Sequence, residues 1–234
     1  GGESWPERLA PELETRGFGP VESFNGGVPG YSSRETLAAW YDRVARYQPD
    51  VAVFYLGWND VKYMKPFREG WDVDRYYSYR GLFETQYRFL TAPRPLRNWY
   101  ALKKMVAARL GGGGLPENRA PKAPSAEALT PWPESGGIEF WRRNVRAFVR
   151  RARADGALPV LAAQATLVVP DLDPELRERV VYRYVRLDHD ALVEVNEVMV
   201  RVLASVAEAE GVPFVDVRSE MNGRAEYFSD HVHL

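Results

Sequence analysis

The chain has 234 residues, 45% hydrophobic and 27% charged, which is typical of one globular domain with a sizeable core. Its formal net charge of −1 would not draw it to nucleic acid or to an anionic membrane, and no apolar run approaches the roughly 18 residues of a membrane span. The absence of cysteine excludes disulfides, thiolate metal sites and cysteine nucleophiles. The oligomeric state stays open. Localisation stays open as well, because a targeting or anchoring segment would precede Gly1.

The first expected element is a helix that begins at Ser4. There the sequence Ser-Trp-Pro-Glu combines a capping hydroxyl, a proline in the first turn and a glutamate three residues after the serine. The apolar run at residues 21–24 predicts the first buried strand. A glycine-rich turn follows at residues 25–33, and its backbone amides can bind an anion.

A second helix and a second strand follow this turn. Apolar residues at spacings of three and four predict a helix over residues 34–47, and residues 51–56 predict a buried strand. The strand runs into Gly57-Trp58-Asn59-Asp60, a tight turn that carries an amide side chain. From about residue 61 to residue 137 the pattern breaks down, so we expect an insertion whose Gly- and Pro-rich second half is a loop.

The second half of the chain predicts helices over residues 139–155 and 191–210, and strands over residues 158–163 and 212–217. The first of these helices carries Arg142, Arg143, Arg146, Arg150, Arg151 and Arg153. Because an apolar stripe runs beside these arginines, we interpret the helix as amphipathic with a solvated basic face rather than as a nucleic-acid ligand.

Strands and helices therefore alternate along the chain. This order predicts an α/β fold in which a parallel sheet is covered by helices on both faces, a doubly wound domain. We expect one domain over residues 1–234, with the insertion at about 61–137. Ligands of such folds bind at the carboxyl ends of the strands, which directs attention to the residues that follow each apolar run.

Three of these strand ends carry residues suited to catalysis. The glycine-rich turn offers a backbone donor, Asn59 offers an amide donor, and the last residues offer an acid and two histidines in Ser-Asp-His-Val-His-Leu. Each motif alone is weak evidence, because asparagine after a strand and Asp-x-x-His are both common in turns and at helix starts. Their joint occurrence in this order carries the functional interpretation.

In this order the motifs resemble the conserved blocks of the SGNH (GDSL-like) hydrolase family, over residues 25–233. The resemblance implies a flavodoxin-like three-layer doubly wound sheet and a serine ester hydrolase that needs no metal or organic cofactor. It assigns Gly30 and Asn59 to the oxyanion hole, Asp230 to the acid of the triad and His233 to the general base. Such a site activates a hydroxyl through an imidazole held by a carboxylate, and preorganised donors stabilise the oxyanion.

The family block that bears the nucleophilic serine has no match. We therefore expect a fragment, truncated at both ends, that lacks the first strand, that carries no nucleophile and that shows no serine-dependent turnover by itself. In the flavodoxin strand order, the first strand would lie between the strands at residues 21–24 and 51–56. Ser4 stands in Gly-Glu-Ser, but it lacks a preceding strand and caps a helix, so we do not assign it this role.

The histidines leave two choices. His231 competes with His233 for the role of base, and spacing alone does not decide between them; the family pattern of two intervening residues selects His233. His189 lies between Asp188 and Asp190, which could suggest a metal site. We interpret these aspartates as capping residues of the helix that follows.

The substrate class remains broad. We expect a small-molecule or carbohydrate ester, with an O-acyltransferase acting on a sugar or polymer hydroxyl, or an inactive binding domain, as alternatives. Aromatic side chains of the insertion either line an acyl or sugar pocket or pack the insertion onto the domain, and we favour packing. They are Trp71, Tyr76, Tyr77, Tyr79, Phe83, Tyr87, Phe89, Trp99 and Tyr100.

Overall fold

The structure is a computed structural model that describes residues 5–61, 136–185 and 187–234. The expected insertion and its aromatic group lie almost entirely outside these residues, as does Ser4. In chain order the helices and strands are α1 (Trp5–Thr15), α2 (Ser33–Ala39), β1 (Val51–Tyr55), α3 (Trp58–Val61), α7 (Gly136–Ala154), β2 (Leu158–Ala163), α8 (Pro174–Arg177), α9 (Tyr182–Val185), α10 (His189–Glu210), β3 (Phe214–Asp216) and α11 (Arg218–Met221).

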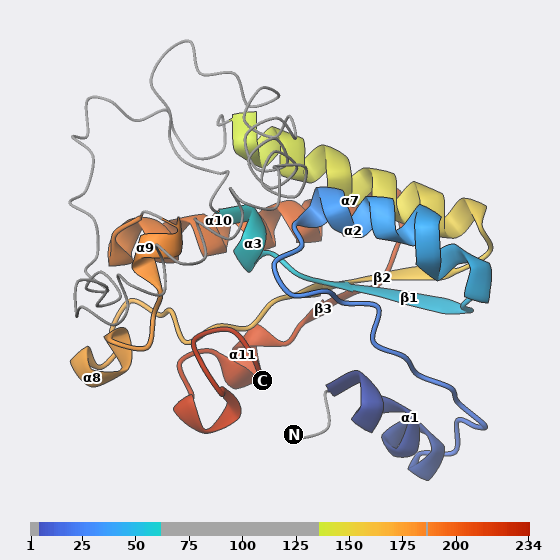
Figure 1. The fold of residues 1–234 in the computed structure, drawn as a ribbon, viewed down its shortest axis with the longest axis horizontal. Coiled ribbons are helices and arrows are strands. Elements are labelled where there is room, and N and C mark those ends of the chain that lie inside the picture. Colours follow the sequence, from blue (N-terminus) through green and yellow to red (C-terminus); the bar gives the residue numbers. More distant parts are fainter. Residues whose placement is uncertain (1–4, 62–135, 186) are drawn as a thin grey trace, which may run out of the picture.

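The three described strands form one parallel sheet in the order β1-β2-β3 (Figure 1). Val51 pairs with Leu158 at the start of β1, and Leu161 pairs with Phe214 in β3. The α/β class and the parallel sheet are therefore confirmed. All the carboxyl ends of these strands meet at one edge, where the motifs of the sequence lie.

The long helices gather on one face of this sheet (Figure 1). Ala52, Phe54 and Leu161 point into the core on that side and are at most 7% exposed. On the other face, Val51 and Val53 are 52% and 39% exposed. On that face Trp5 of α1 packs edge-on against Tyr55, with ring centroids 5.6 Å apart.

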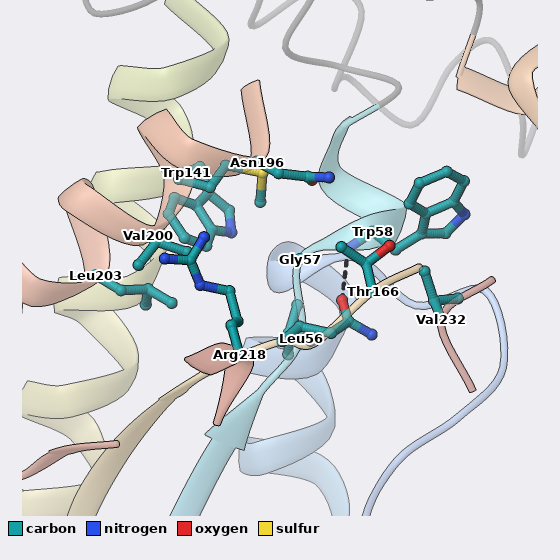
Figure 2. Close-up of a pocket in the computed structure, with 12 residues that line it drawn as sticks. Leu56, Gly57, Trp58, Trp141, Thr166, Asn196, Val200, Leu203, Arg218 and Val232 are labelled. Carbon is teal, nitrogen blue, oxygen red and sulfur yellow. Dashed lines mark hydrogen bonds between the residues drawn. The ribbon is translucent and has the colours of Figure 1, made fainter. Parts of the chain in front are cut away.

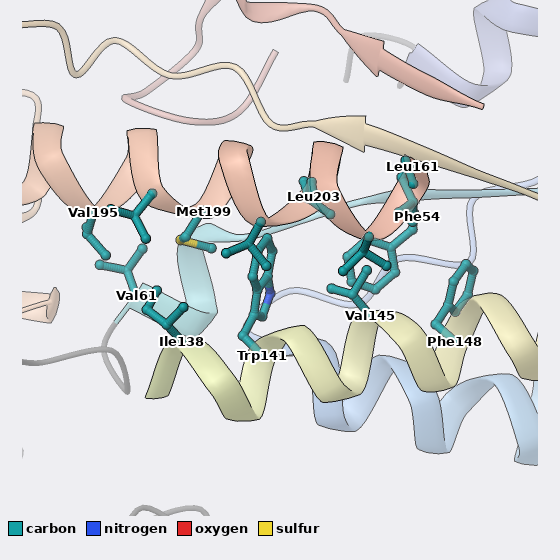
Figure 3. Packing of buried hydrophobic residues seen from close by; sticks show 14 of the residues in the cluster. Phe54, Val61, Ile138, Trp141, Val145, Phe148, Leu161, Val195, Met199 and Leu203 are labelled. Atoms are coloured by element: carbon teal, nitrogen blue, oxygen red, sulfur yellow. The ribbon is translucent and has the colours of Figure 1, made fainter. Parts of the chain in front are cut away.

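The core lies between the sheet and the helices α7 and α10. Trp141, Val145 and Phe148 of α7 meet Phe54 from the sheet and Leu203 from α10 (Figure 3). Fully burying a side chain of this kind contributes about 1.5 to 3 kcal/mol. The basic helix expected over residues 139–155 is thus amphipathic, and some of its arginines are paired on the surface, as between Arg150 and Glu210 at 2.8 Å.

The prediction of a strand over residues 21–24 is wrong. These residues form no strand, and Phe24 is 49% exposed. An apolar run becomes a strand only when a neighbouring strand takes up its backbone hydrogen bonds, and no described strand pairs with this segment. The segment is instead held by Ser23, whose hydroxyl donates to the carbonyl of Pro6 at 2.6 Å.

The other elements agree with expectation to within a few residues. The helix expected over residues 34–47 begins at Ser33 and ends through a π turn (Trp40–Val44) and a 3-10 turn (Ala45–Tyr47). The helix expected over residues 191–210 begins at His189, because the carboxylate of Asp188 accepts a hydrogen bond from the amide of Ala191 at 2.8 Å. This bond confirms the capping interpretation of Asp188.

Candidate active site

The carboxyl ends of β1 and β2 are joined through the turn at Gly57-Trp58. The Oε1 atom of Gln164, which follows β2, accepts a hydrogen bond from the backbone amide of Trp58 at 2.8 Å (Figure 2). A Cβ atom on Gly57 would stand 3.0 Å from the Cε atom of Met199, so a larger residue there would require the end of this methionine side chain to move by a few tenths of an ångström. The turn is thus held by Gln164 on one side and lies against Met199 on the other. Asn59 is the residue that follows it.

The structure brings Asn59 to the glycine-rich turn. Its Nδ2 atom donates to the carbonyl of Tyr31 at 3.0 Å, across 28 residues of sequence. Gly30 precedes this carbonyl and has φ +84°, a left-handed conformation that favours glycine. The two residues assigned to the oxyanion hole therefore lie in segments that touch.

Asp230 and His233 form a pair in the last loop. The Nδ1 atom of His233 lies 2.5 Å from Oδ2 of Asp230, while the other oxygen, Oδ1, accepts the backbone amides of Val232 at 2.8 Å and His233 at 2.9 Å. The carboxylate thus orients the ring through one oxygen and the loop through the other. The side chain of His233 is 69% exposed, which leaves Nε2 accessible to a hydroxyl.

This arrangement keeps Asp230 ionised. Burial of the carboxyl group would raise its pKa, but the hydrogen bond from the His233 ring and those from the backbone amides of Val232 and His233 outweigh burial and lower the pKa to about 2. A carboxylate that stays charged at neutral pH holds the Nδ1–H tautomer of the ring. Nε2 is then the nitrogen that can accept a proton.

His231 occupies a different environment from His233. Its ring is 4% exposed and packs edge-on against Trp58 with centroids 4.3 Å apart, and its Nδ1 atom lies 3.9 Å from Oδ1 of Asp230. Burial lowers its pKa, against the opposing effect of Asp230. The geometry therefore favours His233 as the partner of Asp230. His231 instead joins the last loop to the turn before Asn59 through its contact with Trp58.

The described serines near the site have structural partners. The hydroxyl of Ser32 donates to the carboxylate of Glu35, and that of Ser33 donates to Asp60 at 2.6 Å. Ser229 donates to the backbone carbonyl of His233 at 3.1 Å. Within the described ranges no serine hydroxyl forms a hydrogen bond with the His233 ring.

His189 is held as a structural residue. Its Nδ1 atom lies 2.8 Å from the hydroxyl of Tyr182, and its Nε2 atom lies 2.8 Å from the carbonyl of Val169. Both ring nitrogens are thus occupied by protein groups. Among the described residues, no group of three or more His, Cys, Asp or Glu side chains is placed to hold a metal ion.

A cavity of about 30 Å³ lies behind the turn at Gly57-Trp58 (Figure 2). Trp141 and Asn196 line it, and neither the indole Nε1 nor the amide Nδ2 has a hydrogen-bond partner in the described part of the chain. The space suits one or two water molecules and is too small for an ester substrate. It belongs to the support of the site rather than to its binding surface.

Sequence reasoning did not anticipate three supporting residues of this edge. These residues are Gln164, His231 and Asp60, and each contacts a partner that is distant in sequence. Gln164 and His231 both contact Trp58, and Asp60 contacts Ser33. Asp60 was visible as the last residue of the Gly-x-Asn-Asp motif. Its partner was not, because no local pattern links residues 33 and 60.

Comparisons with known proteins identify a family and a similar fold. The sequence matches the GDSL-like Lipase/Acylhydrolase family over residues 1–234. One similar solved structure is a point mutant of Axe2, an acetyl-xylooligosaccharide esterase from a Geobacillus species, with TM-score 0.51 and 15% identity over 99% of this chain and 74% of that chain. Another is the acetyl xylan esterase AlAXEase, with TM-score 0.48 and 13% identity over 99% and 82% of the two chains. None of the curated proteins matches the sequence. At these identities the first structure supports the fold.

No helix in the described ranges is both long enough and apolar enough to cross a membrane.

Proposed function

The chain belongs to the GDSL-like lipase/acylhydrolase family, and from that premise we propose that it serves carboxylic ester hydrolysis by a serine acyl-enzyme route. In this proposal His233 is the general base, Asp230 orients it, and the amide of Gly30 and the side chain of Asn59 stabilise the oxyanion. The observation that carries the proposal is the Asp230–His233 pair at 2.5 Å, with an exposed ring at the edge of the sheet that also carries Asn59.

The chemistry proceeds in two halves. A serine hydroxyl attacks the ester carbonyl and passes its proton to Nε2 of His233, and the carbonyl oxygen becomes an oxyanion. The imidazolium then protonates the leaving alcohol, and an acyl-enzyme remains. Water attacks this ester, again giving its proton to Nε2, and the carboxylic acid leaves as the serine recovers its proton. Asp230 stays ionised throughout, which stabilises the imidazolium in both halves.

For the nucleophile we propose a serine other than those that the structure describes. The support is that the hydroxyls of Ser32 and Ser33 are bound to Glu35 and Asp60, and that no described serine is bonded to the His233 ring. Labelling with a fluorophosphonate probe, followed by peptide mass mapping, tests this directly. Stoichiometric labelling at Ser32, Ser33 or another described serine would contradict the assignment.

For the substrate we propose an acetylated carbohydrate. The support is the fold shared with the Geobacillus structure, whose description names it an acetyl-xylooligosaccharide esterase. The test supplies the natural full-length polypeptide with p-nitrophenyl acetate and with acetylated xylooligosaccharides, and measures released acetate. Acetate release from both substrates, lost in His233→Ala, is expected; release from neither would contradict the proposed function. Transfer of acetyl groups to added sugar without free acetate would instead identify an acyltransferase.

A further inference from the structure

A buried carboxylate lies beside the proposed oxyanion hole. Asp60 follows Asn59 in α3 and is 0% exposed. Its Oδ1 and Oδ2 atoms accept the backbone amide of Ser33 at 3.1 and 2.9 Å, and Oδ1 also accepts the hydroxyl of Ser33 at 2.6 Å. Burying a charge is costly unless hydrogen bonds satisfy it, so these bonds are required for the carboxylate to stand there.

The same serine connects α3 to a third element. The Oγ atom of Ser33 accepts a hydrogen bond from Nδ2 of Asn144 at 2.9 Å, and Asn144 is a residue of α7 that is 8% exposed. The side chains of Asp60, Ser33 and Asn144 thus form one buried chain of hydrogen bonds across α3, α2 and α7. We call these three residues the clasp.

The clasp lies next to the contact that joins the two oxyanion donors. Asn59 reaches the carbonyl of Tyr31, and Asp60 reaches Ser33, so two consecutive residues of one segment hold two positions of the other. Gly30 directly precedes Tyr31. A movement of residues 31 and 33 relative to Asn59 would therefore break the bonds of Asp60 to Ser33.

We infer that Asp60 is a positioning residue of the oxyanion hole, which acts through Ser33 to keep the Gly30 amide and the Asn59 amide in register. The inference rests on the proposed function. Oxyanion donors act through preorganisation, and a misplacement of about 1 Å can cost about 100-fold in rate. A residue that touches neither substrate nor nucleophile then controls kcat.

The decisive variant is Asp60→Asn, which keeps the size of the side chain. An amide has one oxygen, so its NH2 group would face the amide or the hydroxyl of Ser33 and oppose a donor with a donor. We expect kcat in the natural full-length polypeptide to fall about 10- to 100-fold, with KM changed by less than about threefold. The matched control is Asp188→Asn, because asparagine caps a helix as well as aspartate does, and it should leave both constants within about twofold.

Combination with Asn59→Ala separates positioning from folding. Once the Asn59 donor is gone, Asp60→Asn can misplace only the Gly30 amide, so it should cost a smaller factor in kcat in that background than in the unmodified protein. An equal loss of kcat in both backgrounds would overturn the inference, because it would show that Asp60 acts independently of the donor. If Asp60→Asn does not fold, Ser33→Ala decides by the same pair of measurements, since it removes the hydroxyl and leaves the backbone bond.

A readout without catalysis distinguishes the inference from the proposed function. The side-chain amide of Asn59 has its own NMR resonances, which should shift in Asp60→Asn or Ser33→Ala and not in Asp188→Asn. If the unmodified protein shows no ester hydrolysis, the proposed function fails while these shifts still support the clasp. Unchanged Asn59 resonances in both variants would overturn the clasp, whatever the activity.

Discussion

The two halves of the candidate site are built from contacts of opposite range. The acid–base half joins Asp230 to His233 across three residues, on an exposed loop. The donor half joins Asn59 to Tyr31 across 28 residues, and the clasp beside it spans 27 and 111 residues through buried groups. The comparison teaches that the reactive groups of this site need little of the fold, whereas the donors that would stabilise the transition state depend on how three helices pack.

The largest expected effect comes from the exposed half. His233→Ala removes the proposed general base, so kcat on p-nitrophenyl acetate should fall about 10⁵- to 10⁶-fold. The melting temperature should change by less than about 2 °C, because an exposed hydrogen-bonded pair contributes little to stability. The matched control is Ser229→Ala, which alters the same loop and should keep kcat within about threefold. A large loss in both variants would mean that the loop, rather than the ring, is required.

The next effect tests the orienting carboxylate. Asp230→Asn places an amide against the ring and loses the preference for the Nδ1–H tautomer, so kcat should fall about 10³- to 10⁴-fold with little change in KM. Steady-state kinetics at neutral pH measure this loss. If the activity of Asp230→Asn stays within tenfold of the unmodified protein, Asp230 does not orient the base.

The donor half should give a smaller loss. Asn59→Ala removes one oxyanion donor, and kcat should fall about 10²- to 10³-fold. Asn59→Asp, which keeps the shape and loses the N–H groups, should fall at least as far. Thermal melts recorded beside the kinetics should show a shift in both variants, because this half also holds the fold. Full activity in Asn59→Asp would contradict a donor role.

The smallest effect concerns stability against pH. Because the folded-state pKa of Asp230 is lowered to about 2, the paired carboxylate stabilises the folded state above about pH 4, and this contribution is lost as pH falls toward 2. The side chain of Asp230 is 44% exposed, so solvent screening keeps the contribution below about 1 kcal/mol. Urea unfolding of the unmodified protein and Asp230→Asn should give a difference in free energy that shrinks between pH 5 and pH 2.5. A difference that stays constant with pH would show that the ionised pair contributes nothing.

The predicted strands were correct where neighbouring strands were present to pair with them. Leu158–Ala163 forms β2 at the predicted bounds, between two neighbouring strands that take up its hydrogen bonds. Residues 21–24 carry a similar apolar pattern and form no strand, because a strand also requires a partner that the pattern does not reveal. Within the described part of the chain, Val51 and Val53 stay exposed on the face of the sheet away from α7 and α10.

By itself, the sequence determined the α/β class, the positions of most helices and strands, and the motifs that carry the reactive side chains. Those features follow from local periodicity and from residue chemistry, which a short window contains. The family spacing already selected His233 as the partner of Asp230, and the structure places the two side chains together. Only the tertiary structure decided that Gln164 fixes the turn before Asn59 and that Asp60 holds Ser33. Both contacts depend on burial and on a hydrogen-bond partner that is distant in sequence. A local sequence pattern contains neither kind of information.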